Sequence, residues 1–485
     1  MTNKVSYNQW YAGMSNDIWQ RRKGEYYYSE GIDVRNDGKA FQLYGFDKDI
    51  LSLPLGNTLT SVLGNPKSWP DLFGFKNGYL KDSSGTSYNT AISEDITDIG
   101  IYGDYAYLVH WTGVSRWQID LTASDLGLGT DGSNITTDYF TFSGENCQKI
   151  LALDETGDYA YLYGGKDIYR FASDYTSQQL SIVRSNGSGQ SVKKITRIGS
   201  NYHIFFADKK IIIPGRIASV TDTVKTQKRV NYDGYTILDA INSGNANYVI
   251  AEDKMQNRTS ILIDSGYKNQ ELYSTRWGEQ NPYDNARIVF DNIDDNIAKL
   301  SKKGSMVYIS GWQTGRVYSL WKQYSELSQA LTVDYKDASD ITCLWAIEDG
   351  IVVGTTNEIN IIRLVDPEDT QQYSGYLETT PFVGKEQSTN KRLKNVWIWY
   401  EMDDTSWISG EQATIKIYRK YDKENYELIN TIDSNEDANG YRKLYTVNGS
   451  FNKLQLKVEL DKDDVQSPKV FDIGFTYDIV DNGKK

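Results

Sequence analysis

The sequence predicts an all-β protein, in which a β-propeller of about six or seven blades is followed by a small antiparallel β-sandwich. The hexapeptide Gly-Asp-Tyr-Ala-Tyr-Leu occurs twice, at Gly103–Leu108 and at Gly157–Leu162. Each copy lies between two other short strand patterns, and a unit of about 40–60 residues built only of short strands is typical of a propeller blade. The chain also contains 37 Tyr, 14 Phe and 12 Trp residues, and aromatic residues favour strands. No segment carries a sustained apolar stripe with helical period.

Residues 1–64 form an aromatic-rich N-terminal leader. Its large aromatic side chains lie among glycines and do not alternate before residue 25: Trp10, Tyr11, Trp19, Tyr26, Tyr27 and Tyr28. Such side chains are costly to leave in water, so we expect them to pack on this protein or on a partner. The stretch Ser29–Leu43 predicts a hairpin with an Asp-Gly turn, which is a candidate for closing the ring of blades. Ring closure and docking are both compatible with the pattern.

Residues 65–366 are predicted to form the propeller. Seven units share the pattern of a short apolar strand, an alternating second strand and a third strand. The first strands of these units are Asp71–Phe75, Ile99–Tyr102, Ile150–Leu153, Lys194–Gly199, Ile237–Ile241, Ile297–Leu300 and Ile341–Trp345. The alternative is a large β-sandwich with hairpins of similar length.

Residues 367–375 are predicted to be a linker, and residues 376–485 a β-sandwich domain. The linker begins with an acidic stretch that contains Pro367. Beyond it, five longer strands alternate cleanly between apolar and polar residues, which predicts one face in the core and one face in water. These strands are Asn395–Tyr400, Ala413–Arg419, Tyr426–Ile432, Lys453–Leu460 and Val470–Tyr477.

The sequence offers few candidates for catalysis. His110 and His203 are the only histidines, and each interrupts an aromatic strand, where a structural role is expected. Cys147 and Cys343 have no metal-site spacing and fit small buried side chains. Nucleotide-binding and nucleophile motifs are missing as well. We therefore predict no enzymatic activity, catalytic residue, cofactor or metal ion.

A carbohydrate-binding or glycan-cleaving β-propeller remains the alternative function. Glycoside hydrolysis needs only two suitably spaced carboxylates, and this chain has 65 acidic residues. However, the repeats typical of sialidases are missing, and acidic pairs such as Asp294 and Asp295 fit solvated turns.

The net charge of −13 argues against sequence-specific binding to DNA, because such binding needs clustered Lys and Arg. An acidic surface along which DNA slides without adhering, and ordinary solubility, explain this charge equally well. Met1–Val5 lacks the apolar stretch of a signal peptide, and no run approaches the roughly 18 apolar residues of a membrane span. We expect a soluble protein made in a reducing cytoplasm.

The two ends of the chain resemble structural proteins of tailed-bacteriophage virions. The N-terminal match comprises Trp10–Asp17 and the aromatic segment Gly24–Arg35, which ends in Ile-Asp-Val-Arg. The C-terminal match comprises the segments Thr380–Phe382, Lys391–Val396, Phe451–Lys457 and Ser467–Phe475. Together they cover about 100 residues, and in such virion proteins a propeller-like body is joined to a β-sandwich.

This resemblance implies a tail nozzle or stopper, or a tail-tip protein, which lines or caps the channel for DNA ejection. Its implied partners are the tail adaptor or portal-proximal ring, or other tail-tip proteins. It also implies a homo-oligomeric ring through which DNA passes transiently, in the tail of a virion assembled in the host cytoplasm. The leader aromatics, from Trp10 to Tyr28, are then the candidate contacts with a neighbouring subunit.

Overall fold

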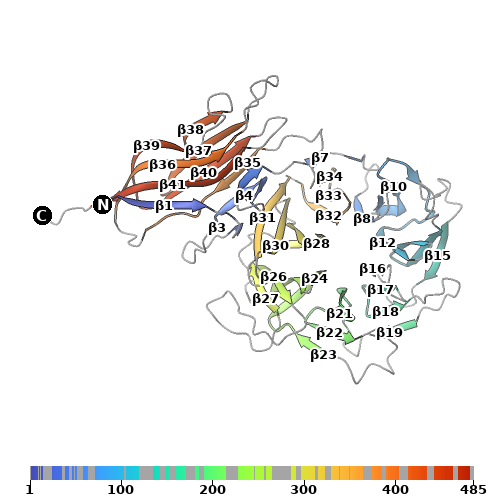
Figure 1. Ribbon diagram of the computed structural model, residues 1–485. Coiled ribbons are helices and arrows are strands. Elements are labelled where there is room, and N and C mark those ends of the chain that lie inside the picture. Colours follow the sequence, from blue (N-terminus) through green and yellow to red (C-terminus); the bar gives the residue numbers. More distant parts are fainter. Residues whose placement is uncertain are drawn as a thin grey trace. The chain divides into compact units, whose positions relative to one another are not determined.

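Figure 1 shows a computed structural model of the chain. The structure describes residues 2–8, 10, 13–14, 25–34, 39–42, 46–47, 50–51, 58–63, 71–102, 105–118, 135–141, 149–151, 160–170, 181–184, 190–214, 228–244, 246–255, 258–264, 286–290, 297–311, 315–322, 329–337, 339–348, 350–363, 374–384, 389–402, 413–433, 442–461 and 468–480. Within these ranges the chain forms 41 strands and one 3₁₀ turn, η1 (Lys76–Gly78). None of the helices in this part of the chain is long and apolar enough to cross a membrane. The protein is therefore all-β in the described residues, as the sequence predicts.

Seven sheets of four strands each follow one another along the described chain. The first sheet consists of β8 (Leu59–Leu63), β9 (Leu72–Phe75), β10 (Leu80–Asp82) and β11 (Ser87–Tyr88). The second consists of β12 (Ile96–Tyr102), β13 (Tyr105–His110), β14 (Gly113–Gln118) and β15 (Ile135–Thr141). The third consists of β16 (Lys149–Leu151), β17 (Tyr161–Tyr163), β18 (Asp167–Arg170) and β19 (Ser181–Arg184).

The next two sheets are β20 (Lys194–Ile198), β21 (Asn201–Phe205), β22 (Lys209–Pro214) and β23 (Lys228–Asn231), and then β24 (Tyr235–Ser243), β25 (Ala246–Asp253), β26 (Arg258–Asp264) and β27 (Ala286–Phe290). The last two are β28 (Ile297–Lys303), β29 (Met306–Gly311), β30 (Arg316–Lys322) and β31 (Gln329–Lys336), and then β32 (Ile341–Ala346), β33 (Gly350–Thr355), β34 (Ile359–Arg363) and β7 (Phe46–Asp47).

Most neighbouring first strands of these sheets contact each other. Contacts join β8 to β12, β12 to β16, β20 to β24, β24 to β28 and β28 to β32, and β32 returns to β8. The sheets therefore follow one another around a circle, with their first strands innermost (Figure 1). This radial arrangement of antiparallel sheets is a β-propeller.

The two hexapeptide copies lie in equivalent strands. Tyr107 on β13 is paired with Arg116, and Tyr161 on β17 is paired with Arg170. On the other side of each strand, the following leucine of the repeat is paired with an isoleucine of the innermost strand. Tyr159 lies outside the described residues. The sequence repeat thus marks the second strand of two successive blades.

Two larger sheets share one hydrophobic core. The first has the order β39 (Lys443–Phe451), β36 (Lys391–Glu401), β41 (Lys469–Ile479), β6 (Ala40–Gln42) and β5 (Ile32–Asp33), and β1 (Asn3–Asn8) also pairs with β41. The second has the order β38 (Glu427–Asp433), β37 (Thr414–Tyr421), β40 (Leu454–Asp461), β35 (Gly375–Glu378) and β4 (Tyr28–Glu30). Val396, Ile415 and Phe475, from both sheets, belong to the same buried cluster.

By compactness the chain divides into two units. One comprises Met1–Asp47, Arg316–Lys336 and Ile362–Lys485, and we call it the two-sheet unit. The other comprises Lys48–Gly315 and Asp337–Ile361, and we call it the propeller unit. Residues 1–47 of the leader thus belong to one unit with the C-terminal region, although the propeller separates them in sequence, whereas the end of the leader, with β8, belongs to the propeller unit.

The leader hairpin does not close the ring of blades. Its strands β5 and β6 pair with each other, and β6 pairs with β41 through Lys469↔Phe41 and Val470↔Ala40. The short strand β7, a few residues further on, lies in the sheet of β32, β33 and β34 instead. The hairpin joins the other sheet because its apolar residues Ile32, Val34 and Ala40 are buried in the core of the two-sheet unit.

Candidate functional site

The structure buries two of the leader aromatics inside the chain itself. Trp10 and Tyr26 are each 0 % exposed and belong to the core of the two-sheet unit. Tyr28 is half-buried, and its ring lies 5.8 Å from that of Tyr376. Tyr27 is 38 % exposed. The expectation that a neighbouring subunit buries Trp10 and Tyr26 is thus wrong, because the sheets of the same chain already enclose them. Tyr11 and Trp19 lie outside the described residues.

Besides Tyr27, the described aromatic of this unit that is most exposed is Trp399, which lies on the strand β36. Its side chains alternate between the two faces of the sheet. Val396, Ile398 and Tyr400 belong to the core. Trp397 and Trp399 alternate with these residues, and therefore lie on the outer face.

Trp399 stacks on Phe471 of β41. Their ring centroids are 5.2 Å apart and their planes differ by 26°. Trp399 is 47 % exposed, so that the pair presents a flat aromatic surface to solvent. Leu444 on β39, which is paired with Trp397 in the sheet, is 64 % exposed.

Trp397 lies on the same face but is covered by cationic side chains. Lys4 Nζ lies 4.7 Å from the centre of its rings, and the Arg442 guanidinium lies 5.5 Å from it. Its indole also lies over Gly474, where a Cβ would overlap the Trp397 ring and the Val5 carbonyl oxygen. These contacts leave Trp397 only 1 % exposed. Cations over an aromatic face are attracted by its quadrupole, which holds Lys4 and Arg442 at this position.

Further charged groups border these rings. Lys39 Nζ lies 5.1 Å from the Phe471 ring. Asp472 accepts hydrogen bonds from Ser6 Oγ at 2.7 Å and from Trp397 Nε1 at 3.4 Å. Glu401 forms an ion pair with Lys469 at 3.3 Å. The carboxylates of this face thus have partners in the sheet, whereas Lys4 and Lys39 contact aromatic rings.

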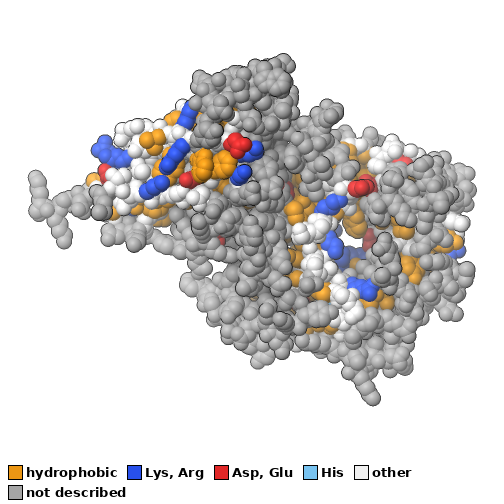
Figure 2. All heavy atoms as spheres, viewed as in Figure 1, with side chains coloured by type: hydrophobic (Ala, Val, Ile, Leu, Met, Phe, Trp, Pro, Cys, Tyr) orange, Lys and Arg blue, Asp and Glu red, His pale blue; other side chains and the backbone are white. Residues whose placement is uncertain are grey.

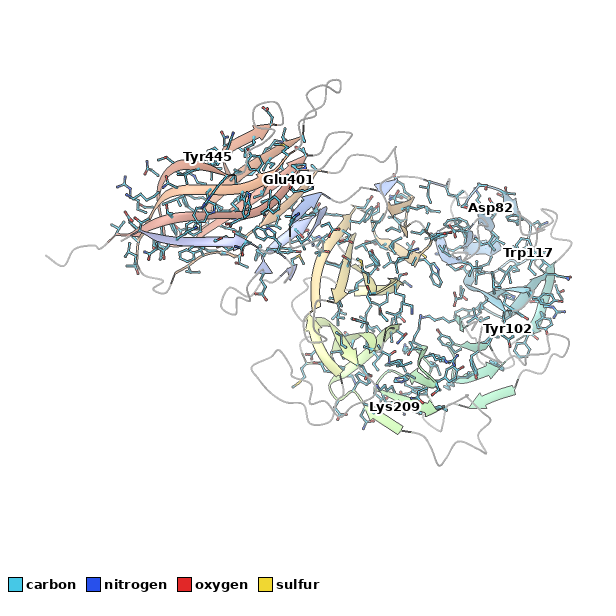
Figure 3. All side chains as sticks on the ribbon, viewed as in Figure 1. Asp82, Tyr102, Trp117, Lys209, Glu401 and Tyr445 are labelled. Carbon is cyan, nitrogen blue, oxygen red and sulfur yellow. The ribbon has the colours of Figure 1, made fainter. Side chains whose placement is uncertain are left out.

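We call this surface the outer aromatic face and define it by Trp397, Trp399, Leu444 and Phe471 with Lys4, Lys39 and Arg442. In Figure 2, apolar side chains of the two-sheet unit gather beside Lys and Arg side chains. Tyr445 and Glu401 mark β39 and β36 in Figure 3. Exposed aromatic and arginine side chains are enriched at protein interfaces. The outer aromatic face is therefore the candidate interaction site.

The sequence contains a signal for this face that the pattern analysis did not use. Asn395–Tyr400 was expected to have one apolar and one wet face. Instead, Val396, Ile398 and Tyr400 alternate with two tryptophans. Large apolar residues at consecutive positions of a strand place apolar surface on both faces of its sheet.

The two histidines are both buried in the propeller unit. His110 Nδ1 lies 3.1 Å from Glu94 Oε2, and its Nε2 lies 3.1 Å from Ser115 Oγ. His203 Nδ1 lies 3.0 Å from Asn247 Nδ2. Both imidazoles thus occupy positions that suit a structural histidine, as the sequence predicts.

The remaining candidates for chemistry do not converge. Cys343 is buried, and burial raises the pKa of its thiol to about 12, so the reactive thiolate is scarce. Cys147 lies outside the described residues. Within the part of the chain that the structure describes, no group of three His, Cys, Asp or Glu side chains is placed to hold a metal ion.

Comparison with known proteins gives similarity in structure only. No protein-family model matches the chain, and no curated protein does. One similar solved structure is described as "YCF48 bound to D1 peptide"; it is 12 % identical with a TM-score of 0.45, and the match covers 66 % of this chain and 97 % of that one. Another is the WD40 domain of Pan2 from Neurospora crassa, at 6 % identity and a TM-score of 0.40, with 66 % and 96 % covered.

Proposed function

We propose that this chain is a structural component of a bacteriophage tail. In this proposal it forms a ring as a tail nozzle, stopper or tail-tip protein, and its two-sheet unit is a β-sandwich that contacts neighbouring virion subunits. The chain acts as a rigid support rather than as an enzyme. It works in the virion, after synthesis in the host cytoplasm.

One observation carries this proposal. The two ends of the chain that resemble tail proteins meet in a single structural unit. From the N-terminal match, Tyr28–Glu30 pairs with β35, which in turn pairs with β40 of the C-terminal region. Lys391–Val396 and Val470–Phe475, from the C-terminal match, lie on the paired strands β36 and β41. A resemblance that is split in the sequence is thus contiguous in the fold.

The outer aromatic face supplies the surface for subunit contact. Aromatic and Arg side chains dominate the energetics of protein interfaces, and truncation of a central one costs about 2 kcal/mol or more of binding free energy. Its basic side chains favour an acidic partner surface, and another copy of this chain, with a net charge of −13, provides one. We place the subunit contact here rather than at Trp10 and Tyr26.

A carbohydrate-binding or glycan-cleaving protein is the second candidate. The observation that favours it is the stacked pair of Trp399 and Phe471, because sugar rings also stack on flat, exposed aromatic surfaces. In that case a monomer binds glycan through this face, and no ring is needed.

Assembly of the purified chain separates the two candidates. We expect closed rings at micromolar concentration in negative-stain images and by mass photometry. Trp399→Ala should weaken ring assembly at least about tenfold, whereas Trp111→Ala, which removes a 52 % exposed tryptophan of the propeller unit, should not. A monomer that retains a specific glycan through Trp399 would contradict the tail proposal and support the alternative.

A further inference from the structure

Seven residues occupy equivalent positions on the innermost strands of the propeller. On each innermost strand, the residue comes directly before an apolar residue that is paired with an apolar residue of the second strand. In five of the sheets, a β-bulge precedes the residue. We call them the axial ring: Ser61, Asp98, Lys149, Lys194, Asp239, Lys299 and Cys343. Equivalent positions on radially arranged strands lie at one level around the central axis.

The carboxylates of the axial ring are held by backbone amides. Asp98 accepts from the amides of Ile99 and Ile150 at 3.0 and 2.9 Å. Asp239 accepts from the amide of Ala240 at 2.9 Å. Both aspartates are 8 % exposed. Their positions are therefore fixed by the strands β12, β16 and β24.

The lysine side chains of the axial ring are more exposed than the aspartates, and fewer short hydrogen bonds hold them. Lys149 and Lys194 lie 3.7 and 3.9 Å from the same oxygen, Asp239 Oδ1. These separations exceed the roughly 2.7–3.2 Å of an N–H···O hydrogen bond, so the contacts are electrostatic. The side chains of Lys149 and Lys194 are 35 % and 24 % exposed, against 12 % for Asp239. The ammonium groups thus lie nearer to solvent than the carboxylate does.

Lys299 adds a third ammonium group to the axial ring. Its side chain is exposed, and among the described residues it forms neither a hydrogen bond nor an ion pair. Its positive charge nevertheless acts on other residues of the axial ring. It helps to lower the pKa of Asp239, and it partly offsets the rise that burial causes in the pKa of the Cys343 thiol. In Figure 2, Lys and Arg side chains border the central hollow of the propeller unit.

Three ammonium groups and two carboxylates leave this site with an excess of positive charge, in a chain whose net charge is −13. Each ammonium carries three N–H donors. Lys149 Nζ donates one long hydrogen bond, of 3.5 Å, to the Lys193 carbonyl oxygen. Its distance to Asp239, like that of Lys194, is too long for a hydrogen bond. A small oxyanion would supply closer acceptors, and charge-assisted hydrogen bonds of this kind are the strong ones. We infer that the axial ring binds a small oxyanion, a phosphate or a carboxylate, between Lys149, Lys194 and Lys299.

The site that we infer is built by side chains from several blades. Lys149 and Asp239 approach each other from β16 and β24, which are separated around the circle by β20. This inference rests on the propeller alone and does not depend on the proposed tail function.

Titration calorimetry on the full chain tests the inference, with inorganic phosphate and succinate as probes and chloride as the control anion. We expect saturable binding of at least one probe, weakened at least about tenfold by Lys299→Met or Lys194→Met. The matched control is Lys254→Met, an exposed lysine of the same unit outside the axial ring. Phosphate or succinate should also raise the melting temperature of the wild type and of the control, but not that of Lys299→Met.

Two results would overturn the inference. One is the absence of saturable binding of both probes to the wild-type chain. The other is equal binding of the probes by the wild type and by Lys299→Met, when the two proteins have the same melting temperature without added anion. Binding of phosphate without succinate, or the reverse, identifies which oxyanion the site takes.

Discussion

Lys149 Nζ lies 3.7 Å from Asp239 Oδ1, although the two residues belong to sheets that are not neighbours in the propeller. At this level, side chains of these two sheets therefore meet past the sheet of β20–β23 that lies between them.

Replacement of Asp239 should destabilise the propeller. Asp239→Asn removes the carboxylate that faces Lys149 and Lys194, and leaves two ammonium groups close together. Burial raises the pKa of Asp239, but the charges of Lys149 and Lys194 outweigh it and hold the pKa below its usual value. We expect a loss of about 1–3 kcal/mol in the free energy of unfolding, measured by urea denaturation. Asp233→Asn, at an exposed turn, is the control, and an equal loss in both variants would contradict the axial contact.

Truncation of Trp10 should lower the stability of the isolated chain. Trp10 is fully buried in the core of the two-sheet unit. Replacing a buried Trp by Ala costs about 3–5 kcal/mol, because it removes apolar contacts and leaves a cavity. We expect a clear drop in the melting temperature of Trp10→Ala and little change in Trp111→Ala, followed by circular dichroism. An unchanged melting temperature in Trp10→Ala would mean that this side chain acts in an interface instead.

The C-terminal region should not fold alone. The fragment of residues 376–485 lacks β1 and β6, which pair with β41, and β4, which pairs with β35. It also lacks Trp10 and Tyr26, so its core and two strand edges are left open. We expect aggregation or an unfolded spectrum on size exclusion and circular dichroism, and recovery when residues 1–47 are co-expressed. A cooperative melt of the fragment alone would refute the contribution of the leader.

His203 should make the propeller sensitive to acid. Burial lowers the pKa of His203 to about 4 from 6.5, and the charge of Lys210 acts in the same direction. Because the unfolded chain takes up the proton first, this stabilisation is complete above pH 6.5 and is lost as the pH falls through about 4. The loss amounts to about 3 kcal/mol in the free energy of unfolding.

The variant His203→Gln isolates this effect. It keeps a polar group beside Asn247, whose side chain lies 3.0 Å from His203 Nδ1, but it does not titrate. Between pH 6.5 and 4, the free energy of unfolding should fall less steeply in the variant than in the wild type. Parallel curves in urea denaturation would show that His203 contributes nothing to the pH dependence.

Local sequence patterns were sufficient to locate the blades. The repeat Gly-Asp-Tyr-Ala-Tyr-Leu marks β13 and β17, because the same alternation of side chains suits the same position in each blade. The apolar runs from Ile99, Ile150 and Leu344 likewise lie on innermost strands. Strand and turn preferences are local properties, so one stretch of sequence reveals them.

Local sequence does not determine which strands pair with one another. The leader aromatics had to be buried, but the hydrophobic effect has no direction, and the same side chains suit a core, a ring closure or another subunit. The structure decides this by pairing Asn3–Asn8 with the far end of the chain, at β41. The outer aromatic face was missed for a related reason: an alternating strand predicts that one face is buried, but not what the other face meets.

By itself, the sequence determined that this protein is all-β, with repeated short strands and a distinct C-terminal pattern, because side-chain period and turn chemistry act between near neighbours. Only the tertiary structure decided that the leader strands β1, β4, β5 and β6 complete the two-sheet unit. It also decided that Lys149, Lys194 and Asp239 meet in the axial ring and that Trp399 faces solvent. These outcomes depend on contacts between residues far apart in the chain, whose pairing is set by the packing of all the sheets together.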